Sequence, residues 1–130
     1  MSVDSIGNFF TSIRNAVARA SRFVKVPHSN FKYQIGLILL EEGFIKEVCV
    51  EGDGIDKKIV IFLKYVNNES VIHEVKQVSK PGRRVYIKFN CIPIVIGGLG
   101  IAILTTSKGV MTNKKLKEQN IGGELICTIW

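Results

Sequence analysis

Apolar residues near the N-terminus recur with the period of an α-helix. Turned at about 100° per residue, they fall within a stripe roughly 100° wide, and they are Ile6, Phe9, Phe10, Ile13, Val17 and Ala20. We predict a helix that packs this stripe into a core, with Asp4 or Ser5 as its N-cap. Arg14, Arg19 and Arg22 occupy the opposite arc, where each fits either an ordinary solvated face or an outward-facing contact with an anion.

A second helix is predicted after a short strand. Residues 23–26 form a strand candidate that Pro27 closes. Ser29 can cap a helix that Gly43 ends. The apolar positions of that helix are Phe31, Ile35, Ile38 and Leu39.

Two β-rich runs follow the second helix. Residues 44–50 and 58–65 are rich in β-branched and aromatic side chains, and Glu51-Gly52-Asp53-Gly54 between them is favourable turn chemistry for a hairpin. The first half therefore predicts the order helix, strand, helix, strand, strand, with both helices on a three-stranded sheet.

The second half is predicted to be mainly β. The polar run at residues 66–69 indicates a junction, so we place a domain boundary near Asn67. Lys80-Pro81-Gly82 is a strong turn signal. The expected strands are 71–78, 84–89, 99–106 and 124–130, with a short polar helix at 113–119.

Together these elements predict an α+β fold of two modules. Residues 1–66 form an N-terminal αβαββ domain. Residues 67–130 form a smaller, mainly β C-terminal domain with one short helix, packed against the first. A chain of 130 residues is long enough for one compact unit or for two small ones that share a core.

The charge of the chain favours a polyanionic partner. Lys and Arg number 18 against 11 Asp and Glu, which gives a net charge of +7. Residues 1–66 contribute +2 and residues 67–130 contribute +5. Composition admits nucleic acid or an anionic membrane, and the second half is the better candidate for the anion-facing surface.

The cysteines and histidines do not form a recognisable site. The three cysteines, Cys49, Cys91 and Cys127, are widely spaced. Because His28 and His73 stand apart from them, neither a disulfide framework nor a metal site is expected. The chain does not open on a basic stretch followed by an apolar run, and its apolar runs are too short or too rich in glycine to span a bilayer. We expect a reduced, cytoplasmic protein that binds no cofactor.

Two glycine-rich or hydroxyl-rich segments do not match the enzyme motifs that they resemble. Gly97-Gly98-Leu99-Gly100 precedes a predicted strand, and Ile103 stands where a dinucleotide-binding loop has its third glycine. Residues 105–109 lack the leading glycine and the Gly-Lys-Ser/Thr order of a P-loop. Ser107 and Lys108 are adjacent, and on an extended segment their side chains point in opposite directions, which disfavours a nucleophile and base pair. No catalytic residue is expected.

Residues 105–109 are instead suited to RNA. They place three hydroxyls, a cation and a glycine at the end of a predicted strand, where these groups can meet 2′-hydroxyls, base edges and phosphates. A Ser/Thr-rich turn that satisfies its own backbone fits the same residues equally well.

Tyr86 and Glu124 each admit two interpretations. Tyr86 is either a half-buried strand residue or a stacking platform among basic groups, which are Lys80, Arg83, Arg84 and Lys88. Glu124, after Gly122-Gly123, is either a solvated carboxylate or an acceptor that holds hydroxyls or an arginine in place.

Two stretches of the second half resemble a known family signature. Residues 99–112, Leu-Gly-Ile-Ala-Ile-Leu-Thr-Thr-Ser-Lys-Gly-Val-Met-Thr, and residues 120–127, Asn-Ile-Gly-Gly-Glu-Leu-Ile-Cys, resemble the C-terminal signature of the bacterial-type small-subunit ribosomal protein eight family. Residues 13–16, 41–45 and 78–86 extend the resemblance over essentially the whole chain, in the family's order.

The sequence departs mildly from the family pattern. Thr105 replaces a serine and keeps its hydroxyl, and Gly7-Asn8 replaces the usual Ala-Asp. Ser12 stands where an arginine is common, which removes a positive charge from the first helix and weakens the expectation of RNA contacts there.

The resemblance implies a structural constituent of the small ribosomal subunit and not an enzyme. It implies primary binding to the central domain of small-subunit ribosomal RNA, which stabilises an irregular helix and promotes subunit assembly. By resemblance, the RNA-binding residues are Tyr86, Thr105, Thr106, Ser107, Lys108, Gly122, Gly123 and Glu124. The expected secondary RNA contacts are Arg14, Arg19, Arg83 and Arg84.

The same resemblance names the expected partners, which are small-subunit ribosomal RNA and neighbouring small-subunit ribosomal proteins. The expected location is the cytoplasmic ribosome, with an organelle-encoded plastid copy as a minor alternative. Some family members also bind their own messenger RNA, and that partner stays open. No membrane or small-molecule substrate is expected. Two alternatives remain, a free-standing structured-RNA-binding module or RNA chaperone and, more remotely, a small Ser/Lys enzyme.

Overall fold

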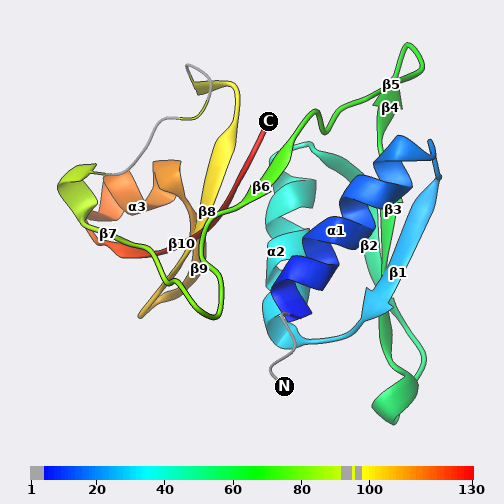
Figure 1. Ribbon diagram of the computed structural model, residues 1–130, viewed down its shortest axis with the longest axis horizontal. Coiled ribbons are helices and arrows are strands. Elements are labelled where there is room, and N and C mark those ends of the chain that lie inside the picture. The colour runs from blue at the N-terminus through cyan, green and yellow to red at the C-terminus, as the bar shows by residue number, and fades with distance from the viewer. Residues whose placement is uncertain (1–4, 92–94, 96–97) are drawn as a thin grey trace. The chain divides into compact units, whose positions relative to one another are not determined.

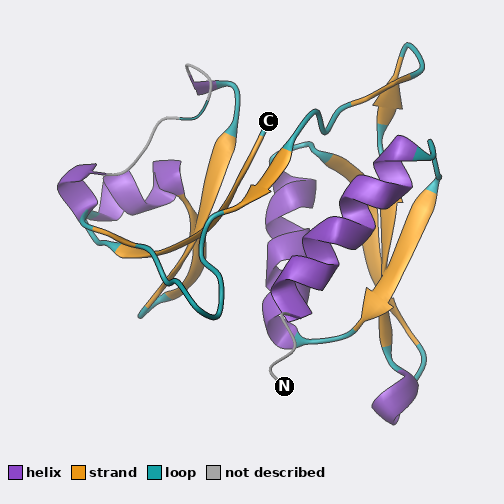
Figure 2. Cartoon of the chain, in the orientation of Figure 1, coloured by secondary structure: helices purple, strands orange, loops and turns teal. Residues whose placement is uncertain are grey.

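The computed structural model describes residues 5–91, 95 and 98–130 (Figure 1). The chain forms two compact units. The first comprises Asn8–His73, and the second comprises Glu74–Trp130 together with residues 5–7. Helices and antiparallel strands occur in the same chain (Figure 2), so the predicted α+β class is confirmed. The division into domains 1–66 and 67–130 stays a prediction.

The first unit is a three-stranded antiparallel sheet with helices against one face (Figure 1). Its strands lie in the order β1-β3-β2, and the predicted αβαββ order is present. The buried side chains of the first helix include Phe9, Phe10 and Ile13, and the central strand buries Ile59 and Ile61. The elements are α1 (Ser5–Ala18), β1 (Phe23–Pro27), α2 (Asn30–Glu41), β2 (Ile45–Glu51), the 3-10 turn Gly54–Asp56 and β3 (Lys58–Leu63).

Local chemistry sets both ends of α2 as predicted. Ser29 is the N-cap, and its Oγ accepts a hydrogen bond from the amide of Lys32 at 3.1 Å. At the other end Gly43 has a φ of 81°. The amides of Gly43 and Phe44 donate to the carbonyls of Leu40 and Leu39 at 3.1 and 2.9 Å. This pair of bonds is a Schellman motif, which satisfies carbonyls that the helix end leaves without partners.

Helix α1 ends before the predicted apolar stripe does. Ala20 lies beyond the helix with a φ of 54° and is exposed, so its prediction as a core residue is wrong. Ala16 is buried in its place. The amides of Ala20 and Ser21 donate to the carbonyls of Val17 and Ala16 at 3.0 and 2.9 Å, which makes a second Schellman motif with alanine in the left-handed position. Of the two N-cap candidates, Ser5 is the first residue of the helix itself, and Asp4 lies outside the described residues.

The predicted polar junction is a tight hairpin. Strands β4 (Tyr65–Val66) and β5 (Glu69–Ser70) pair across Asn67 and Asn68, whose φ values are 53° and 64°. A two-residue loop with both φ values positive is a type I′ turn, in which asparagine is favoured. The Asn-Asn sequence therefore reverses the chain instead of extending it.

The second unit is built around β10. Its sheet has the order β6-β10-β8-β9, and β7 pairs with the same strand β10 that β6 does. One core cluster contains Val95, Ala102, Leu104, Met111, Leu116 and Leu125. The elements are β6 (Val75–Gln77), β7 (Tyr86–Ile87), the 3-10 turn Phe89–Cys91, β8 (Ile101–Thr106), β9 (Gly109–Thr112), α3 (Asn113–Gln119) and β10 (Gly123–Ile129).

Two predicted strands are shorter than expected, and one strand was not predicted. Of residues 71–78 only Val75–Gln77 pair, because their partners are the last residues of β10. Of residues 84–89 only Tyr86–Ile87 pair, with Gly123 and Glu124. The four residues of β9 follow directly after a turn, and the sequence pattern assigned them to no strand or helix.

Candidate nucleic-acid interface

Strand register gathers three of the predicted RNA-binding residues on one face of the second unit's sheet. Strand β10 pairs with β7 and with β8, and Glu124 lies opposite both Tyr86 and Thr105. Directly paired residues of antiparallel strands project from the same face. Tyr86, Glu124 and Thr105 therefore form one row across three strands, which we call the Tyr86–Thr105 row.

The members of this row differ in exposure. Tyr86 is 72% exposed, so its ring is open to stacking and the interpretation as a half-buried strand residue is wrong. Thr105 is half-buried. The side chain of Glu124 is only 14% exposed, which is low for a carboxylate and calls for a partner.

The partner of Glu124 is an arginine. Nη1 of Arg84 donates to Oε2 of Glu124 at 3.2 Å, and the Arg84 side chain is 53% exposed. Of the two interpretations that the sequence leaves for Glu124, the structure shows the acceptor that holds an arginine. The pair also leaves the carboxylate with a neighbouring positive charge, which reduces its repulsion of a polyanion.

A buried serine shapes the loop that carries the neighbouring arginines. Ser79 is 4% exposed, and its Oγ accepts from the amide of Val85 at 3.0 Å and donates to the carbonyl of Val85 at 3.4 Å. Within the loop, Lys80 and Arg83 exchange two backbone hydrogen bonds of 2.9 Å, as the Lys80-Pro81-Gly82 turn signal predicts. Ser79 was not among the predicted site residues, although a hydroxyl directly before a turn is a recognisable signal.

The turn between β8 and β9 presents the remaining predicted residues. Thr106 pairs with Gly109, so Ser107 and Lys108 form an exposed two-residue tip. Oγ1 of Thr106 accepts from the amide of Lys108 at 3.0 Å and donates to the carbonyl of Gly109 at 2.9 Å. The Thr106 hydroxyl thus satisfies backbone groups of its own turn, as one of the two interpretations of residues 105–109 expects. Among the described residues none forms a side-chain hydrogen bond with Ser107.

Gly123 brings β10 close to β8. A Cβ at this position would lie 2.6 Å from the carbonyl oxygen of Thr105 and 2.9 Å from Cγ2 of Thr106. These separations are shorter than van der Waals contact, so only glycine fits without a shift of the backbone. Gly123 therefore has a structural reason to be glycine within the chain itself, and Gly122 before it is exposed.

The predicted secondary contacts are divided between the two units. Arg83 is exposed in the turn that precedes Arg84. Arg14 lies on α1 and Arg19 in the turn after it, so both belong to the first unit, whereas the Tyr86–Thr105 row belongs to the second. The first unit also holds Arg22, which the helical pattern placed with Arg14 but which lies outside the helix, next to β1.

The described part of the chain does not contain a cluster of His, Cys, Asp and Glu that could hold a metal ion. Cys49 and Cys91 are exposed thiols and Cys127 is a buried one. Burial raises the pKa of the Cys127 thiol, which keeps it protonated and unreactive. Ser107 and Lys108 are neighbours at the tip of an exposed turn, without the enclosed pocket that catalysis requires. None of the described helices is long and apolar enough to cross a membrane.

Comparison with known proteins agrees with the resemblance. The family model described as ribosomal protein S8 matches residues 4–130. The curated small ribosomal subunit protein uS8 of Finegoldia magna is 50% identical over 131 residues, which cover 100% of both chains. The protein of that name from Anaeromyxobacter sp. strain K is 48% identical over 128 residues, covering 98% of this chain and 97% of its own. That from Mesoplasma florum is 48% identical over 130 residues and 100% of both chains.

Proposed function

This chain belongs to the ribosomal protein S8 family, and from this membership we propose that it binds the central domain of small-subunit ribosomal RNA through its C-terminal unit. The family is one of ribosomal structural proteins and not of enzymes. The chain is thus a structural component of the ribosome, and by the name of its relatives we assign it to the small subunit. The finer proposal is that it is a primary binder of an irregular RNA helix.

The observation that carries this proposal is the Tyr86–Thr105 row beside the exposed tip of Ser107 and Lys108. The row offers an open aromatic ring and a hydroxyl, and the tip offers a second hydroxyl and a cation. An RNA minor groove displays 2′-hydroxyls and base edges between two lines of phosphates, so these groups suit it. A regular DNA major groove would instead call for a helix or ribbon with long side chains aimed at base edges.

Each residue has a proposed role. Ser107 and Thr105 hydrogen-bond 2′-hydroxyls or displaced base edges, and Lys108 pairs with a phosphate. Tyr86 stacks on a base or ribose that an irregular helix leaves open. Glu124 holds Arg84 through one carboxylate oxygen, and its other oxygen accepts from a base amino group. Thr106 and Gly123 act by shaping the strand ends. The Thr106 hydroxyl holds the turn after β8, and the absence of a side chain at Gly123 lets β10 approach β8 closely.

Binding of this kind stabilises the RNA shape that it recognises. A protein that binds one RNA conformation more tightly than the others raises the population of that conformation in proportion to the difference in affinity. We propose that this is how the chain promotes assembly of the small subunit in the cytoplasm. We also propose that the C-terminal domain, residues 67–130, carries this contact. Neighbouring small-subunit proteins are further proposed partners. The chain's own messenger RNA is a partner if it offers the same RNA shape.

The test is a titration of the full chain at several salt concentrations against two RNAs. One is the internal-loop helix of the central domain, and the other is a fully paired helix of the same length. The proposal expects tighter binding to the irregular helix at physiological salt. Equal, steeply salt-dependent binding to both would mean that the net charge of +7 alone is at work, and would overturn it.

A further inference from the structure

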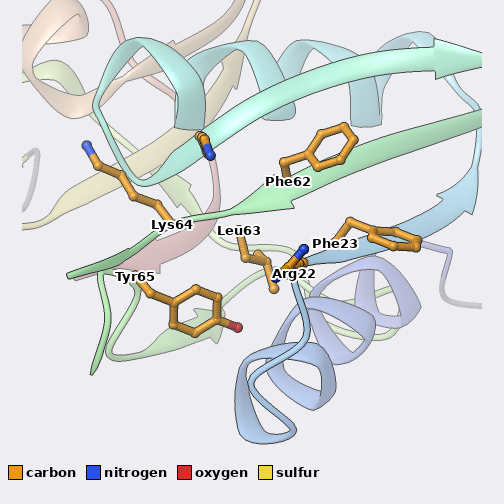
Figure 3. A pocket seen from close by; sticks show the side chains of 7 residues that line it. Arg22, Phe23, Phe62, Leu63, Lys64 and Tyr65 are labelled. Carbon is orange, nitrogen blue, oxygen red and sulfur yellow. The ribbon is translucent and has the colours of Figure 1, made fainter. Parts of the chain in front are cut away.

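The first unit contains a pocket. Apart from Arg22, none of the residues that line it has been considered as a contact so far. Its volume is about 950 Å³, and it opens at the end of the sheet where β1 begins and β3 ends. Figure 3 shows the rings of Phe23 and Phe62, the ring of Tyr65, and Leu63 and Arg22 around it. It is lined by Arg22, Phe23, Lys46, Phe62, Leu63, Lys64 and Tyr65.

Two of its aromatic rings are neighbours by register. Phe23 and Phe62 are paired residues of β1 and β3, and their ring centroids lie 6.0 Å apart at an interplanar angle of 49°. Paired residues project from one face of the sheet, so both rings belong to the same face. Phe23 is 47% exposed, an unusual exposure for phenylalanine in a small sheet, and it leaves a ring surface open at the pocket.

The third aromatic ring is fixed in place. The hydroxyl of Tyr65 donates to the carbonyl of Ser21 at 2.6 Å, and burial raises the pKa of this phenol, so it stays a neutral donor at physiological pH. The amide of Leu63 donates to the carbonyl of Arg22 at 2.8 Å. These two bonds hold the residues before β1 against the end of β3 and the start of β4.

A β-bulge brings a cation to the same pocket. In the β2–β3 ladder Ile45 pairs with Leu63 and Glu47 with Phe62, so Lys46 is an extra residue in β2. At such a bulge two residues of one strand oppose a single residue of the other, which here is Phe62. Lys46 and Glu47 therefore both lie on the face of the sheet that carries Phe62.

The lining carries three cations and no carboxylate. Arg22, Lys46 and Lys64 are all exposed. Three charged residues nearby do not line the pocket. Glu47 is the register partner of Phe62, and Lys25, whose Nζ lies 5.8 Å from the Phe23 ring centroid, is paired with Glu51 at 3.3 Å. The pocket lining thus combines aromatic surface with positive charge, and Glu47 lies on the same face outside the lining.

From this combination we infer that the pocket binds a single-stranded segment of RNA. One unstacked base lies against the Phe23 and Phe62 rings, and Arg22, Lys46 and Lys64 neutralise the phosphates on either side of it. Stacking platforms flanked by cations are the general means of holding unpaired nucleotides. The inference rests on the proposal that the chain binds ribosomal RNA, and it adds a second, single-stranded subsite in the unit that lacks the Tyr86–Thr105 row.

An acidic protein segment would also pair with the cations, but it would make no stacking contact with the aromatic rings. Carboxylates pair with Arg and Lys, whereas a base has a flat π-face that stacks on phenylalanine. Because the Phe23 and Phe62 rings lie in the same pocket as the cations, RNA fits the pocket better than an acidic protein segment does. A hexaglutamate peptide serves as the competing probe.

The experiment is a nuclear magnetic resonance titration of the full chain with the oligonucleotide hexauridylate. Addition of hexauridylate should shift the amide signals at both ends of the pocket, at residues 22–23 and 62–65. The double variant Arg22→Gln with Lys46→Gln should bind roughly tenfold more weakly. Phe23→Ala should weaken binding by a factor of roughly five or more, the scale of one lost base stack. The matched control Lys57→Gln with Lys58→Gln removes the same charge from the same unit outside the pocket lining, and should change affinity less than about twofold.

The possible outcomes separate this inference from the proposed function. Equal shifts of the pocket signals by hexaglutamate and hexauridylate would overturn the inference, as would equal weakening by the pocket variant and its control. Hexauridylate shifts confined to residues 105–108 and Tyr86 would overturn it too, and would leave the C-terminal contact standing. Failure of the irregular helix to bind while hexauridylate still shifts residues 22–23 and 62–65 would overturn the proposed function and support the pocket.

Discussion

Nη1 of Arg84 lies 3.2 Å from Oε2 of Glu124, and this ion pair ties the loop before β7 to the start of β10. The two residues are 40 positions apart in the sequence. The carboxylate is mostly buried and the guanidinium is half-exposed. The proposed RNA contact of Glu124 therefore depends on a neighbour that the sequence did not pair with it.

A double-mutant cycle of Arg84→Ala and Glu124→Ala tests this relationship. We expect a coupling of about 0.5 kcal/mol in the free energy of unfolding, since one partner is half-exposed to solvent. Urea denaturation of the four proteins measures it. In RNA titrations Glu124→Ala should lose more affinity for the irregular helix than Arg84→Ala. Strictly additive stabilities would contradict the ion pair, and equal losses of affinity would mean that Glu124 acts only through Arg84.

Variants at the exposed tip of the β8–β9 turn distinguish a charge contact with RNA from a hydroxyl contact. Lys108→Ala should reduce the slope of log affinity against log salt by roughly 0.7 to 0.9, because one phosphate contact is lost. Ser107→Ala should weaken binding about threefold to tenfold without changing that slope, because only a neutral hydrogen bond is lost. Lys57→Ala, in the first unit, is the matched charge control. Identical slopes and affinities for all three variants would refute the assigned roles.

Gly123→Ala should destabilise the fold by about 1 to 3 kcal/mol, because its Cβ would press on the carbonyl of Thr105 and force the strands apart. Gly82→Ala is the matched control, since its Cβ would meet no atom within 4 Å, and it should change stability by less than about 0.5 kcal/mol. Urea denaturation measures both. Wild-type stability for Gly123→Ala would show that the β8–β10 approach is looser than described.

Ala20→Gly should stabilise the chain by about 0.5 to 1 kcal/mol. Alanine at a φ of 54° costs roughly 1 to 2 kcal/mol that glycine avoids, and the greater freedom of glycine in the unfolded chain removes part of the gain. Ala18→Gly, at the last helical residue, should instead cost about 0.5 kcal/mol. Thermal or urea unfolding gives the two signs, and a loss of stability in Ala20→Gly would contradict the Schellman geometry.

The three thiols should react in two classes. Cys49 and Cys91 are exposed and should react with an aromatic disulfide reagent in the native protein. Cys127 is buried, with its pKa raised by that burial, so it should react only after unfolding in denaturant. Absorbance of the released thiolate counts the reactive groups. Rapid reaction of all three thiols in the native protein would show that β10 is accessible to reagent.

Elements with their own local signals were predicted well. Ser29 and Gly43 bound α2 because a capping hydroxyl and a left-handed glycine act within a few residues of each other. The helix α3 occupies the predicted residues 113–119. Ala20 was wrongly placed in the core because its apolar side chain fits the helical period, whereas the backbone there has already left the helix.

Elements that depend on distant partners were predicted less well. Residues 71–78 have the composition of a strand, but only Val75–Gln77 form a ladder with β10, and backbone hydrogen bonds outside the ladder join Val78 to that strand and Glu74 to the residue after it. The strand β9 was missed because its four residues pair only with β8, and composition alone does not distinguish them from the rest of the turn.

The sequence by itself determined the α+β class, the order of the elements in the first unit, the basic second half and, through the family signature, the ribosomal role of the chain. Tertiary structure alone decided that Glu124 lies between Tyr86 and Thr105, that Arg84 holds its carboxylate, and that a bulge at Lys46 completes a pocket with Phe23 and Phe62. The reason is physical. Caps, turns and charge act between neighbours in the chain, whereas strand register joins residues far apart, and a shift of one residue would send each of these side chains to the opposite face.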